Sequence, residues 1–499
     1  MVSLLSSLLA LTFIGCDRKP QRIAFKSLDT LSAAVIPRPL NLDTVHLEVF
    51  HLSELNKYFS EFQANQNAIG YLDTLTGIGL SPVERKKDAQ LVFTKNDSLG
   101  SHEAYRVIIK AYSIEIEAGS ETGVFRGMST LIQLILQQPE PYLLQTSIED
   151  APEYIYRGMM LDVARHFFPK KTVMTLIDQI ALYKINHLHL HLSDDQGWRI
   201  EIKKWPKLTE IGGTTQVGGG PGGYFTQQDF QDIVNYAATR HVTIVPEIDM
   251  PGHTNAALAS YPELNCDGKA TDLYTGTRVG FSSLCVDKEI TYDFIGDVVQ
   301  EIAAISPGPY IHIGGDESHA TSHDDYVTFV DRVYGIVQET GKTMIGWDEI
   351  AAAPLDSNAI VQFWRNERNA KMGINKGAKI IMSPAFRAYL DMKYDSTTAL
   401  GLTWAGNISP REAYDWSLSK YSELIEQNDI LGVEAPLWSE TIEDLSDIQY
   451  LTFPRLTAYA ELGWTPDSLR SWEDYEQRLR VHYRVMDSLS INAYKIQGK

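Results

Sequence analysis

The chain has 499 residues, of which 64 are acidic and 44 are lysine or arginine, and its formal net charge at pH 7 is −20. A chain of this length is expected to form more than one folding unit, with a sizeable core. The strong negative charge argues against nucleic acid or an anionic membrane surface as a partner, and suits neutral or cationic ligands.

The first 16 residues have the pattern of an export signal. Residues 1–15 form an apolar run rich in leucine and serine, which is too short to span a bilayer as a helix but has the length of a signal-peptide core. Gly15 precedes Cys16, and this pair resembles the bacterial lipobox, in which the cysteine is lipidated and becomes the mature N-terminus. No lysine or arginine precedes the run. We nevertheless favour an exported protein, lipid-anchored through Cys16 in the periplasm or outer membrane, over an uncleaved cytoplasmic N-terminus.

Residues 23–150 predict a small α+β domain. Its predicted strands are residues 45–50, 90–94, 105–109 and 113–117, and the last two form a hairpin pair. Apolar residues then recur at helical spacing over 122–137. This part of the sequence has no cluster of acids, histidines or cysteines, so we interpret it as a supporting domain that ends near residues 148–152.

Residues 151–499 repeat a unit of strand, loop and helix. Eight such units over about three hundred residues predict an α/β fold with a (β/α)8 TIM barrel, in which chemistry occurs at the carboxyl ends of the strands. A doubly wound open sheet is the alternative, but no glycine-rich phosphate loop follows the first strand. The predicted strands are residues 158–161, 187–192, 242–245, 309–313, 343–346, 359–363, 379–382 and 430–433. The clearest helices between them are residues 172–183, 227–240, 292–305 and 326–340.

Polar and aromatic side chains follow every predicted barrel strand. After the fourth strand the chain reads Gly314, Gly315, Asp316 and Glu317, a pattern that alone also fits an acidic helix N-cap. The recurrence of such residues at seven other strand ends favours a binding pocket instead. Indole faces stack on sugar C–H groups and carboxylates bind sugar hydroxyls, so the sequence indicates a carbohydrate site. The residues that follow the other strands include Asp162, Arg165, Asp194, Trp198, Glu247, His253, Trp347, Trp364, Tyr389, Asp391, Trp438 and Glu440.

Three histidines share one face of the second barrel strand. His187, His189 and His191 alternate with period two, like the His-x-His motif of metal-dependent hydrolases. Inward-facing histidines of a buried strand are more often hydrogen-bonded members of the core, which is the interpretation we favour. The cysteine spacing has no zinc signature, so no metal is expected. Cys266 and Cys285 lie in one loop-rich stretch and either pair in an oxidising compartment or remain buried free thiols.

Several long motifs resemble those of the family 20 glycoside hydrolases, the β-N-acetylhexosaminidases. The resemblance covers the whole predicted barrel, and residues 35–39 also resemble the start of the accessory α/β domain of that family. The motifs are RGMMLDVARHF at 157–167, HLHLSDDQGWR at 189–199, PEIDMPGH at 246–253, HIGGDE at 312–317, GWDE at 346–349, YLD at 389–391 and LWSE at 437–440.

The resemblance implies the roles of the catalytic pair. Asp316 and Glu317 are adjacent, so they are expected to project differently and not to flank one bond as a standard carboxylate pair does. The family uses a substrate-assisted route, in which the 2-acetamido oxygen of the sugar attacks the anomeric carbon and forms an oxazolinium. By resemblance Glu317 is the general acid and then the general base, and Asp316 accepts the acetamido N–H.

The resemblance also implies which side chains surround the sugar ring. Trp347, Trp364 and Trp438 are expected to wall the acetamido methyl group. Tyr389 is expected to donate its hydroxyl to the acetamido oxygen, and Trp404 to stack on the neighbouring sugar.

Polar contacts follow from the same resemblance. Arg157, Asp391 and Glu440 are expected to bind the C3, C4 and C6 hydroxyls, and Asp194 with His253 is expected to position and polarise Glu317.

These expectations describe an exo-acting, retaining enzyme that removes terminal β-linked GlcNAc or GalNAc from glycans or chitooligosaccharides. It needs no cofactor, and its partner is an N-acetylhexosamine-containing glycan. Release of a disaccharide, as by a lacto-N-biosidase, is one alternative. A metal-dependent hydrolase on the histidine strand and a non-catalytic glycan-binding protein are the others.

Overall fold

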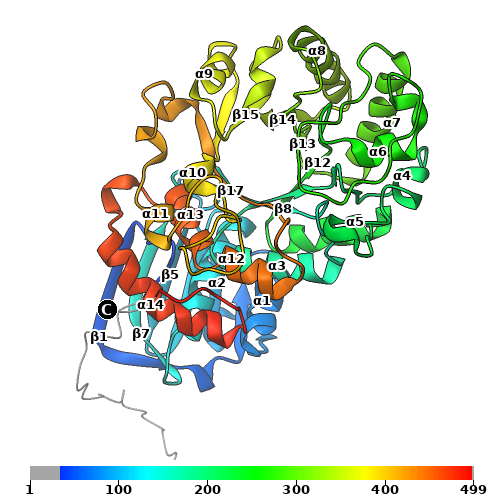
Figure 1. Cartoon of the computed structure of the whole chain (residues 1–499). Helices are drawn as coiled ribbons and strands as arrows, with labels where there is room; N and C mark the ends of the chain where they lie inside the picture. Colours follow the sequence, from blue (N-terminus) through cyan, green and yellow to red (C-terminus); the bar gives the residue numbers. More distant parts are fainter. Residues whose placement is uncertain (1–33, 64, 497–499) are drawn as a thin grey trace, which may run out of the picture.

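The computed structural model describes residues 34–63 and 65–496, apart from the side chains of 45–47 (Figure 1). The expected export signal and its Cys16 lie outside the described residues. Two parts of the fold follow one another along the chain: an open sheet with two helices, and then a closed barrel.

The first part is a mixed sheet of seven strands in the order β1-β7-β5-β6-β4-β2-β3. Helix α1 (Gln66–Thr76) and helix α2 (Glu121–Leu136) pack on each other beside it. The strands are β1 (Asn41–His51), β2 (Lys57–Ser60), β3 (Ser81–Pro82), β4 (Leu91–Lys95), β5 (Tyr105–Lys110), β6 (Ser113–Ala118) and β7 (Tyr142–Asp150).

Helix α2 is buried along almost its whole length, from Gly123 to Ile135. A helix that is covered on all sides must lie between two layers, and α2 lies between the sheet and the barrel. Its Gln133 amide donates to the carbonyl of Leu182 at 2.7 Å, and the Ser129 hydroxyl reaches the carbonyl of Ala181 at 3.4 Å. These contacts attach the first part of the chain to helix α3 (Lys170–Leu182) of the barrel.

The second part is a closed barrel of eight parallel strands, which confirms the predicted TIM barrel. All eight predicted strands are present, and the barrel closes through the pairing of its first strand, β8, with its last, β17. The strands are β8 (Tyr156–Asp162), β9 (His187–His191), β12 (Thr243–Glu247), β13 (Tyr310–His312), β14 (Thr343–Trp347), β15 (Ala359–Phe363), β16 (Lys379–Met382) and β17 (Ile430–Leu437).

Helices cover the outside of the barrel, as Figure 1 shows. The four predicted helices correspond to α3, α5, α7 and α8, and the periodic apolar pattern places each within three residues of its observed ends. The barrel helices are α3 (Lys170–Leu182), α5 (Gln227–Thr239), α7 (Glu289–Ile305), α8 (His323–Glu339), α9 (Glu367–Asn375), α12 (Leu445–Thr452), α13 (Arg455–Trp464) and α14 (Trp472–Ser488).

Three long connections follow strands β9, β12 and β16 at the carboxyl end of the barrel. The first carries the short pair β10 (Ser193–Asp194) and β11 (Gly197–Trp198), and the second carries α6 (Asn255–Ser260). A disulfide joins Cys266 to Cys285 in the second connection, so the paired alternative for these cysteines is correct. Functional groups on parallel barrels reside on such loops.

Among residues 34–63 and 65–496, no helix combines the length and the apolar character needed to cross a membrane.

Candidate active site

The carboxyl ends of the barrel strands surround a cavity of about 330 Å³. It contains the predicted catalytic pair together with most of the side chains expected to hold a sugar. Its lining residues are Arg165, His253, Thr277, Val279, Asp316, Glu317, Trp364, Arg365, Tyr389, Asp391, Leu402, Trp404, Trp438, Glu440 and Thr441.

Strand β13 delivers Asp316 and Glu317 to this cavity through a turn that needs glycine. Gly314 and Gly315 have φ values of 65° and 94°, a region that L-residues other than glycine rarely adopt. A Cβ atom on Gly314 would lie 1.8 Å from Oδ1 of Asp249. Glu317 also has a positive φ, of 45°, so the backbone of this segment is held in a strained conformation by its surroundings, as is common at functional sites.

The two carboxylates differ in how deeply they lie. The side chain of Asp316 is 10% exposed and that of Glu317 is 24% exposed. Burial, together with the negative charges of Glu317 and Glu247, raises the pKa of Asp316 to about 6, although the charge of His253 opposes the shift. The exposed carboxylate therefore faces the entrance, and the buried one lies deeper in the cavity.

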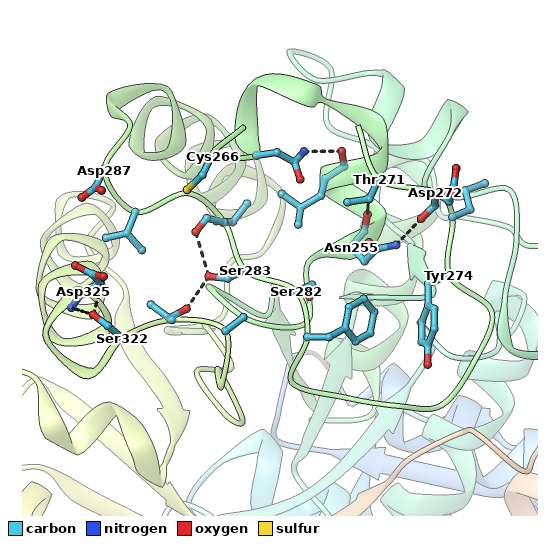
Figure 2. A pocket seen from close by; sticks show the side chains of 18 residues that line it. Asn255, Cys266, Thr271, Asp272, Tyr274, Ser282, Ser283, Asp287, Ser322 and Asp325 are labelled. Carbon is cyan, nitrogen blue, oxygen red and sulfur yellow. Dashed lines mark hydrogen bonds between the residues drawn. The ribbon is translucent and has the colours of Figure 1, made fainter. Parts of the chain in front are cut away.

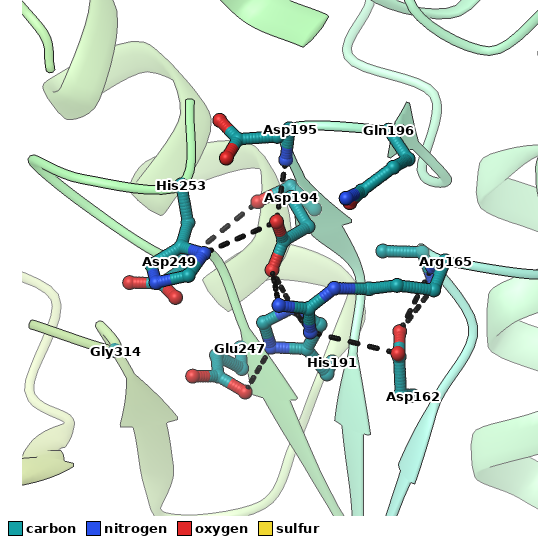
Figure 3. Close-up of polar contacts among 12 residues, drawn as sticks. Asp162, Arg165, His191, Asp194, Asp195, Gln196, Glu247, Asp249, His253 and Gly314 are labelled. Atoms are coloured by element: carbon teal, nitrogen blue, oxygen red, sulfur yellow. Dashed lines mark hydrogen bonds and ion pairs between the residues drawn. The ribbon is translucent and has the colours of Figure 1, made fainter. Parts of the chain in front are cut away.

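His253 connects this pair to Asp194. Its Nε2 atom lies 3.6 Å from Oδ2 of Asp316 and 3.8 Å from Oε2 of Glu317. Its Nδ1 atom is 3.2 Å from Oδ1 of Asp194 (Figure 3). Burial alone lowers the pKa of His253, but the charges of Asp194 and Asp316 raise it well above its usual value. The predicted association of Asp194 and His253 with the catalytic pair is thus present.

Arg165 holds the other oxygen of Asp194. Its Nη2 atom lies 2.8 Å from Asp194 Oδ2, and its Nη1 atom lies 3.5 Å from Asp162 (Figure 3). Although burial alone raises it, the charges of Arg165 and His253 hold the pKa of Asp194 well below its usual range. Asp194 is therefore a carboxylate at neutral pH.

Aromatic rings form one wall of the cavity. Trp364 and Tyr389 are stacked with 6.4 Å between ring centroids, and Trp438 lies 6.4 Å from Tyr389. Trp404 stands at the rim with 51% of its surface exposed and its ring edge-on to Tyr389. Trp347 is only 1% exposed and lies behind Trp438, with 5.8 Å between the two centroids.

Two carboxyl groups of the cavity lining have oxygen atoms without a partner in the described part of the chain. Both side-chain oxygens of Asp391, and Oε2 of Glu440, are buried without a hydrogen-bond partner among the described residues. Burial raises the pKa of both carboxyl groups. Buried polar atoms without a protein partner are costly unless a ligand or water satisfies them, so these two residues mark hydrogen-bonding positions for a polar ligand.

The expectation that Arg157 binds a sugar hydroxyl is wrong. Arg157 lies at the amino end of β8, is 0% exposed, and pairs with Glu103 of the first domain at 2.5 Å. Its Nη1 group also donates to the carbonyl of Tyr154 at 2.7 Å. The arginine that reaches the cavity is Arg165, which follows the carboxyl end of β8, whereas Arg157 lies near the amino end of that strand. The expectation that binding residues follow the carboxyl end of each strand indicates Arg165 as well.

The histidine strand forms a charge-paired core, as favoured from the sequence. His189 lies 2.9 Å from both Glu247 and Glu434, and His191 lies between Glu247 and Asp194. These carboxylates outweigh burial and raise the pKa of His189 to about 9 and that of His191 to about 10. A metal ion binds neutral imidazole, whereas these surroundings favour imidazolium. The residues present therefore fit an ion-pair network better than a metal centre.

A larger cavity of about 560 Å³ lies beside the first, under the connection that carries the disulfide (Figure 2). Several of its polar groups already bond within the protein. Asn255 donates to the carbonyl of Asp272 at 2.9 Å, and the hydroxyls of Ser283 and Thr321 are 2.6 Å apart. The catalytic pair does not line this cavity. The smaller cavity is therefore the candidate active site.

Cleavage of a glycosidic bond requires an acid next to a sugar-binding pocket, and this cavity combines two carboxylates with an aromatic wall, as a glycoside hydrolase needs. The family model for the catalytic domain of glycosyl hydrolase family 20 matches residues 154–326 and 319–467, and the model for domain 2 of that family matches residues 33–151. The chain belongs to glycosyl hydrolase family 20.

Individual relatives agree with this assignment. A β-N-acetylhexosaminidase of Cellulomonas fimi is 40% identical over 467 residues, covering 91% of this chain and 94% of that protein. The structure of the Streptomyces plicatus N-acetyl-β-hexosaminidase in complex with Thio-NAglucal has a TM-score of 0.89 and 44% identity, covering 93% and 96% of the two chains. An exo-β-N-acetylglucosaminidase of Vibrio harveyi, in complex with N-acetylglucosamine, has a TM-score of 0.83 and 30% identity, covering 96% and 80%.

Proposed function

We propose that the chain is an exo-acting, retaining β-N-acetylhexosaminidase that removes terminal β-linked GlcNAc or GalNAc from glycans or chitooligosaccharides. The observation that carries the proposal is the adjacency of Asp316 and Glu317 in one cavity, with the deeper carboxylate beside the aromatic wall. Two acids so placed suit an attack by the acetamido group of the substrate better than a standard pair on opposite faces of the sugar. The names of the relatives support the same substrate class.

In the first step the acetamido oxygen of the sugar forms a bond to the anomeric carbon while the bond to the leaving oxygen breaks. Glu317 donates its proton to that oxygen. Asp316 accepts the acetamido N–H and offsets the positive charge that develops on the oxazolinium. Because a carboxylate in a buried site interacts more strongly than in water, the depth of Asp316 favours this role.

In the second step a water molecule attacks the anomeric carbon from the side that the leaving group vacated. Glu317, now a carboxylate, accepts the proton of that water, and the bond between the acetamido oxygen and the anomeric carbon breaks. Two inversions at one carbon give net retention. His253 and Asp194 keep Glu317 in position through both steps.

The cavity supports release of a single sugar in preference to a disaccharide. Its volume of about 330 Å³ is near the lower end of the range for small-ligand pockets. Trp404, half exposed at the rim, offers a face to the next sugar outside the cavity.

The test is a panel of aryl β-glycosides that differ at C2. We expect rapid hydrolysis of the N-acetylglucosaminide and no detectable hydrolysis of the glucoside, which lacks the attacking amide. We expect Asp316→Asn to reduce kcat on the N-acetyl substrate by about 10²- to 10³-fold. Equal turnover of the glucoside, or near-normal activity of the variant, would contradict the assisted mechanism. Sugar binding without any product would favour a glycan-binding protein, and loss of activity on exhaustive chelation would favour a metal-dependent hydrolase.

We also propose that the enzyme is exported and lipid-anchored through Cys16, in the periplasm or at the outer membrane. The support is the apolar run of residues 1–15 followed by Gly15 and Cys16. The full-length protein should fractionate with membranes, and Cys16→Ala should move the activity to the soluble fraction. A soluble wild-type enzyme in the cytoplasm would contradict this localisation.

A further inference from the structure

Glu247 is a fully buried carboxylate at the carboxyl end of β12, and it touches both parts of the active site. Its Oε2 atom accepts a hydrogen bond from Nδ1 of His191 at 2.6 Å, and its Oε1 atom accepts one from Nε1 of Trp347 at 3.2 Å. The chemical steps above assign it no role. A buried carboxylate is retained only where its partners compensate its desolvation, so the identity of these partners indicates its function.

One side of Glu247 leads to the catalytic acid. His191 donates to Glu247 through Nδ1 and to Asp194 through Nε2, the second contact being 2.8 Å. The other oxygen of Asp194 holds His253 (Figure 3). The Nε2 atom of His253 lies 3.8 Å from Glu317. Alternating imidazoles and carboxylates therefore form a continuous series of contacts from Glu247 to Glu317.

The other side leads to the aromatic wall. Trp347, which Glu247 holds by its indole N–H, lies against Trp438 with 5.8 Å between ring centroids. His191 contacts the same ring edge-on, at 4.9 Å. Trp438 lines the cavity, and two of its ring neighbours, Trp347 and His191, are held by Glu247. A third neighbour, Arg165, lies over the ring at 4.7 Å and is held by Asp194 instead.

His191 is positively charged and therefore depends on the carboxylates of both Glu247 and Asp194. An imidazole that donates from both nitrogens is an imidazolium, and the charges of Glu247 and the hydrogen bond to Asp194 raise the pKa of His191 to about 10 in spite of burial. A neutral residue in place of Glu247 leaves this ring with one carboxylate instead of two. We expect the ring then to move toward Asp194 and to lose part of its contact with Trp438.

We propose that Glu247 is a positioning residue that couples the acid–base relay to the tryptophan wall. Protonation of the leaving group and placement of the N-acyl group are then set by one buried carboxylate. The inference rests on the proposed function, because it assigns an N-acyl group to the tryptophan wall.

The experiment measures two ratios on the purified full-length chain. The first ratio compares kcat/KM for an aryl N-acetyl-β-glucosaminide with a good leaving group (nitrophenyl) and one with a poor leaving group (phenyl), and it reports on the acid. The second compares N-acetyl and N-propionyl nitrophenyl substrates, and it reports on the wall. Ratios are unaffected by the fraction of enzyme that is correctly folded. A variant that only lowers the amount of folded enzyme therefore changes neither ratio.

We expect Glu247→Gln to change both ratios by about tenfold relative to the wild-type enzyme. His253→Asn interrupts the relay at a residue that has no ring contact with Trp438 or Trp347 among the described residues, and it should change the leaving-group ratio and leave the N-acyl ratio within about twofold. A uniform loss of rate in Glu247→Gln, or a change in only one of its two ratios, would overturn the coupling.

A milder variant keeps the proposal testable if Glu247→Gln does not fold. Trp347→Phe retains a ring but removes the N–H that Glu247 accepts, and we expect it to change the leaving-group ratio by about threefold. The matched control is Trp364→Phe, because the Trp364 N–H donates to Glu349 at 3.0 Å instead. It should change only the N-acyl ratio. Identical leaving-group ratios in the two variants would overturn the proposal, whereas a wild-type enzyme that is inactive on every N-acyl substrate would refute the proposed function itself.

Discussion

The Nε2 atom of His253 lies 3.6 Å from the Oδ2 atom of Asp316, and this pair sets the charge on the floor of the cavity. The imidazolium lowers the pKa of Asp316, but burial has the larger effect and raises it to about 6. Asp316 is therefore a carboxylate at neutral pH but becomes neutral in a mildly acidic solution.

The pH dependence of activity follows from this. Below about pH 6 Asp316 carries a proton and no longer offsets the charge of the oxazolinium, so kcat/KM should fall as the pH decreases through about 6 and be retained above it. His253→Asn removes the charge that lowers this pKa, and should move the acidic limb to higher pH. A pH profile of kcat/KM for both enzymes measures the shift. An acidic limb near pH 4 in the wild type would contradict the prediction.

Asp391 and Glu440 should determine how well hydroxyl groups are recognised. Their oxygens are unpartnered in the described structure, and a hydrogen bond to a charged group contributes about 1.5 to 3 kcal/mol. Asp391→Asn and Glu440→Gln should therefore each lower kcat/KM by about 10- to 100-fold.

The control for these two variants is a set of deoxy substrates. Removing the one hydroxyl that a residue binds should cost the wild type as much as the substitution does, and should cost the variant little more. Equal further losses in wild type and variant for every deoxy sugar would show that the residue binds none of these hydroxyls.

Replacement of Arg157 should reduce stability and leave catalysis intact. Removing one partner of a buried ion pair costs about 3 to 5 kcal/mol, and Arg157→Gln leaves Glu103 with Arg126 alone. We expect a lower free energy of unfolding in urea and unchanged kcat and KM in the folded enzyme. Arg165→Gln is the matched comparison, and it should lose activity because Arg165 lines the cavity. A large rise in KM for Arg157→Gln would show that Arg157 contributes to substrate binding after all.

The same ion pair should make the free energy of unfolding depend on pH. Although burial opposes it, Arg157 and Arg126 lower the pKa of Glu103 from 4.5 to about 2. The folded state thus gains about 3 kcal/mol above pH 4.5, and this gain is lost as the pH falls toward about 2. In Glu103→Gln the corresponding slope of stability against pH should be absent.

The disulfide should stabilise the connection that forms part of the cavity. Cys266 and Cys285 are 19 residues apart, and closing a loop of that size contributes about 3 kcal/mol in the chain-entropy model. Thr277 and Val279, which line the cavity, lie inside this loop. The Cys266→Ala, Cys285→Ala double variant should therefore melt at a lower temperature and show a raised KM. Identical KM values before and after reduction of the wild type would contradict the second expectation.

Much of the barrel could be predicted because buried parallel strands are short apolar runs bounded by glycine and charge. The strand-end rule then found Asp316, Tyr389, Asp391 and Glu440 in one cavity. Helix α13 escaped prediction for a physical reason. All of its residues are buried, so its sequence lacks the one-sided apolar pattern that reveals a surface helix.

Other parts of the site depend on register and depth, which a sequence does not specify. Arg157 lies near the start of β8 and Arg165 follows its end, so the two arginines are at opposite ends of the barrel although one motif contains both. Trp347 is the last residue of β14 and Trp438 directly follows β17. Their sequence positions are thus similar, yet Trp347 is more deeply buried and packs against Trp438. Glu247 was visible only as a polar residue at the end of a strand, because its partners come from three other strands.

The contacts beneath the barrel limit how this enzyme can be engineered. Asp150, the last residue of the open sheet, accepts the indole N–H of Trp464 at 2.9 Å and lies 4.0 Å from the buried ammonium of Lys184. Together with Glu103 it neutralises cationic groups that belong to the catalytic half. A protein truncated to the barrel would leave those buried cations without counter-ions. The open-sheet domain and the barrel should therefore be expressed together in any engineered version.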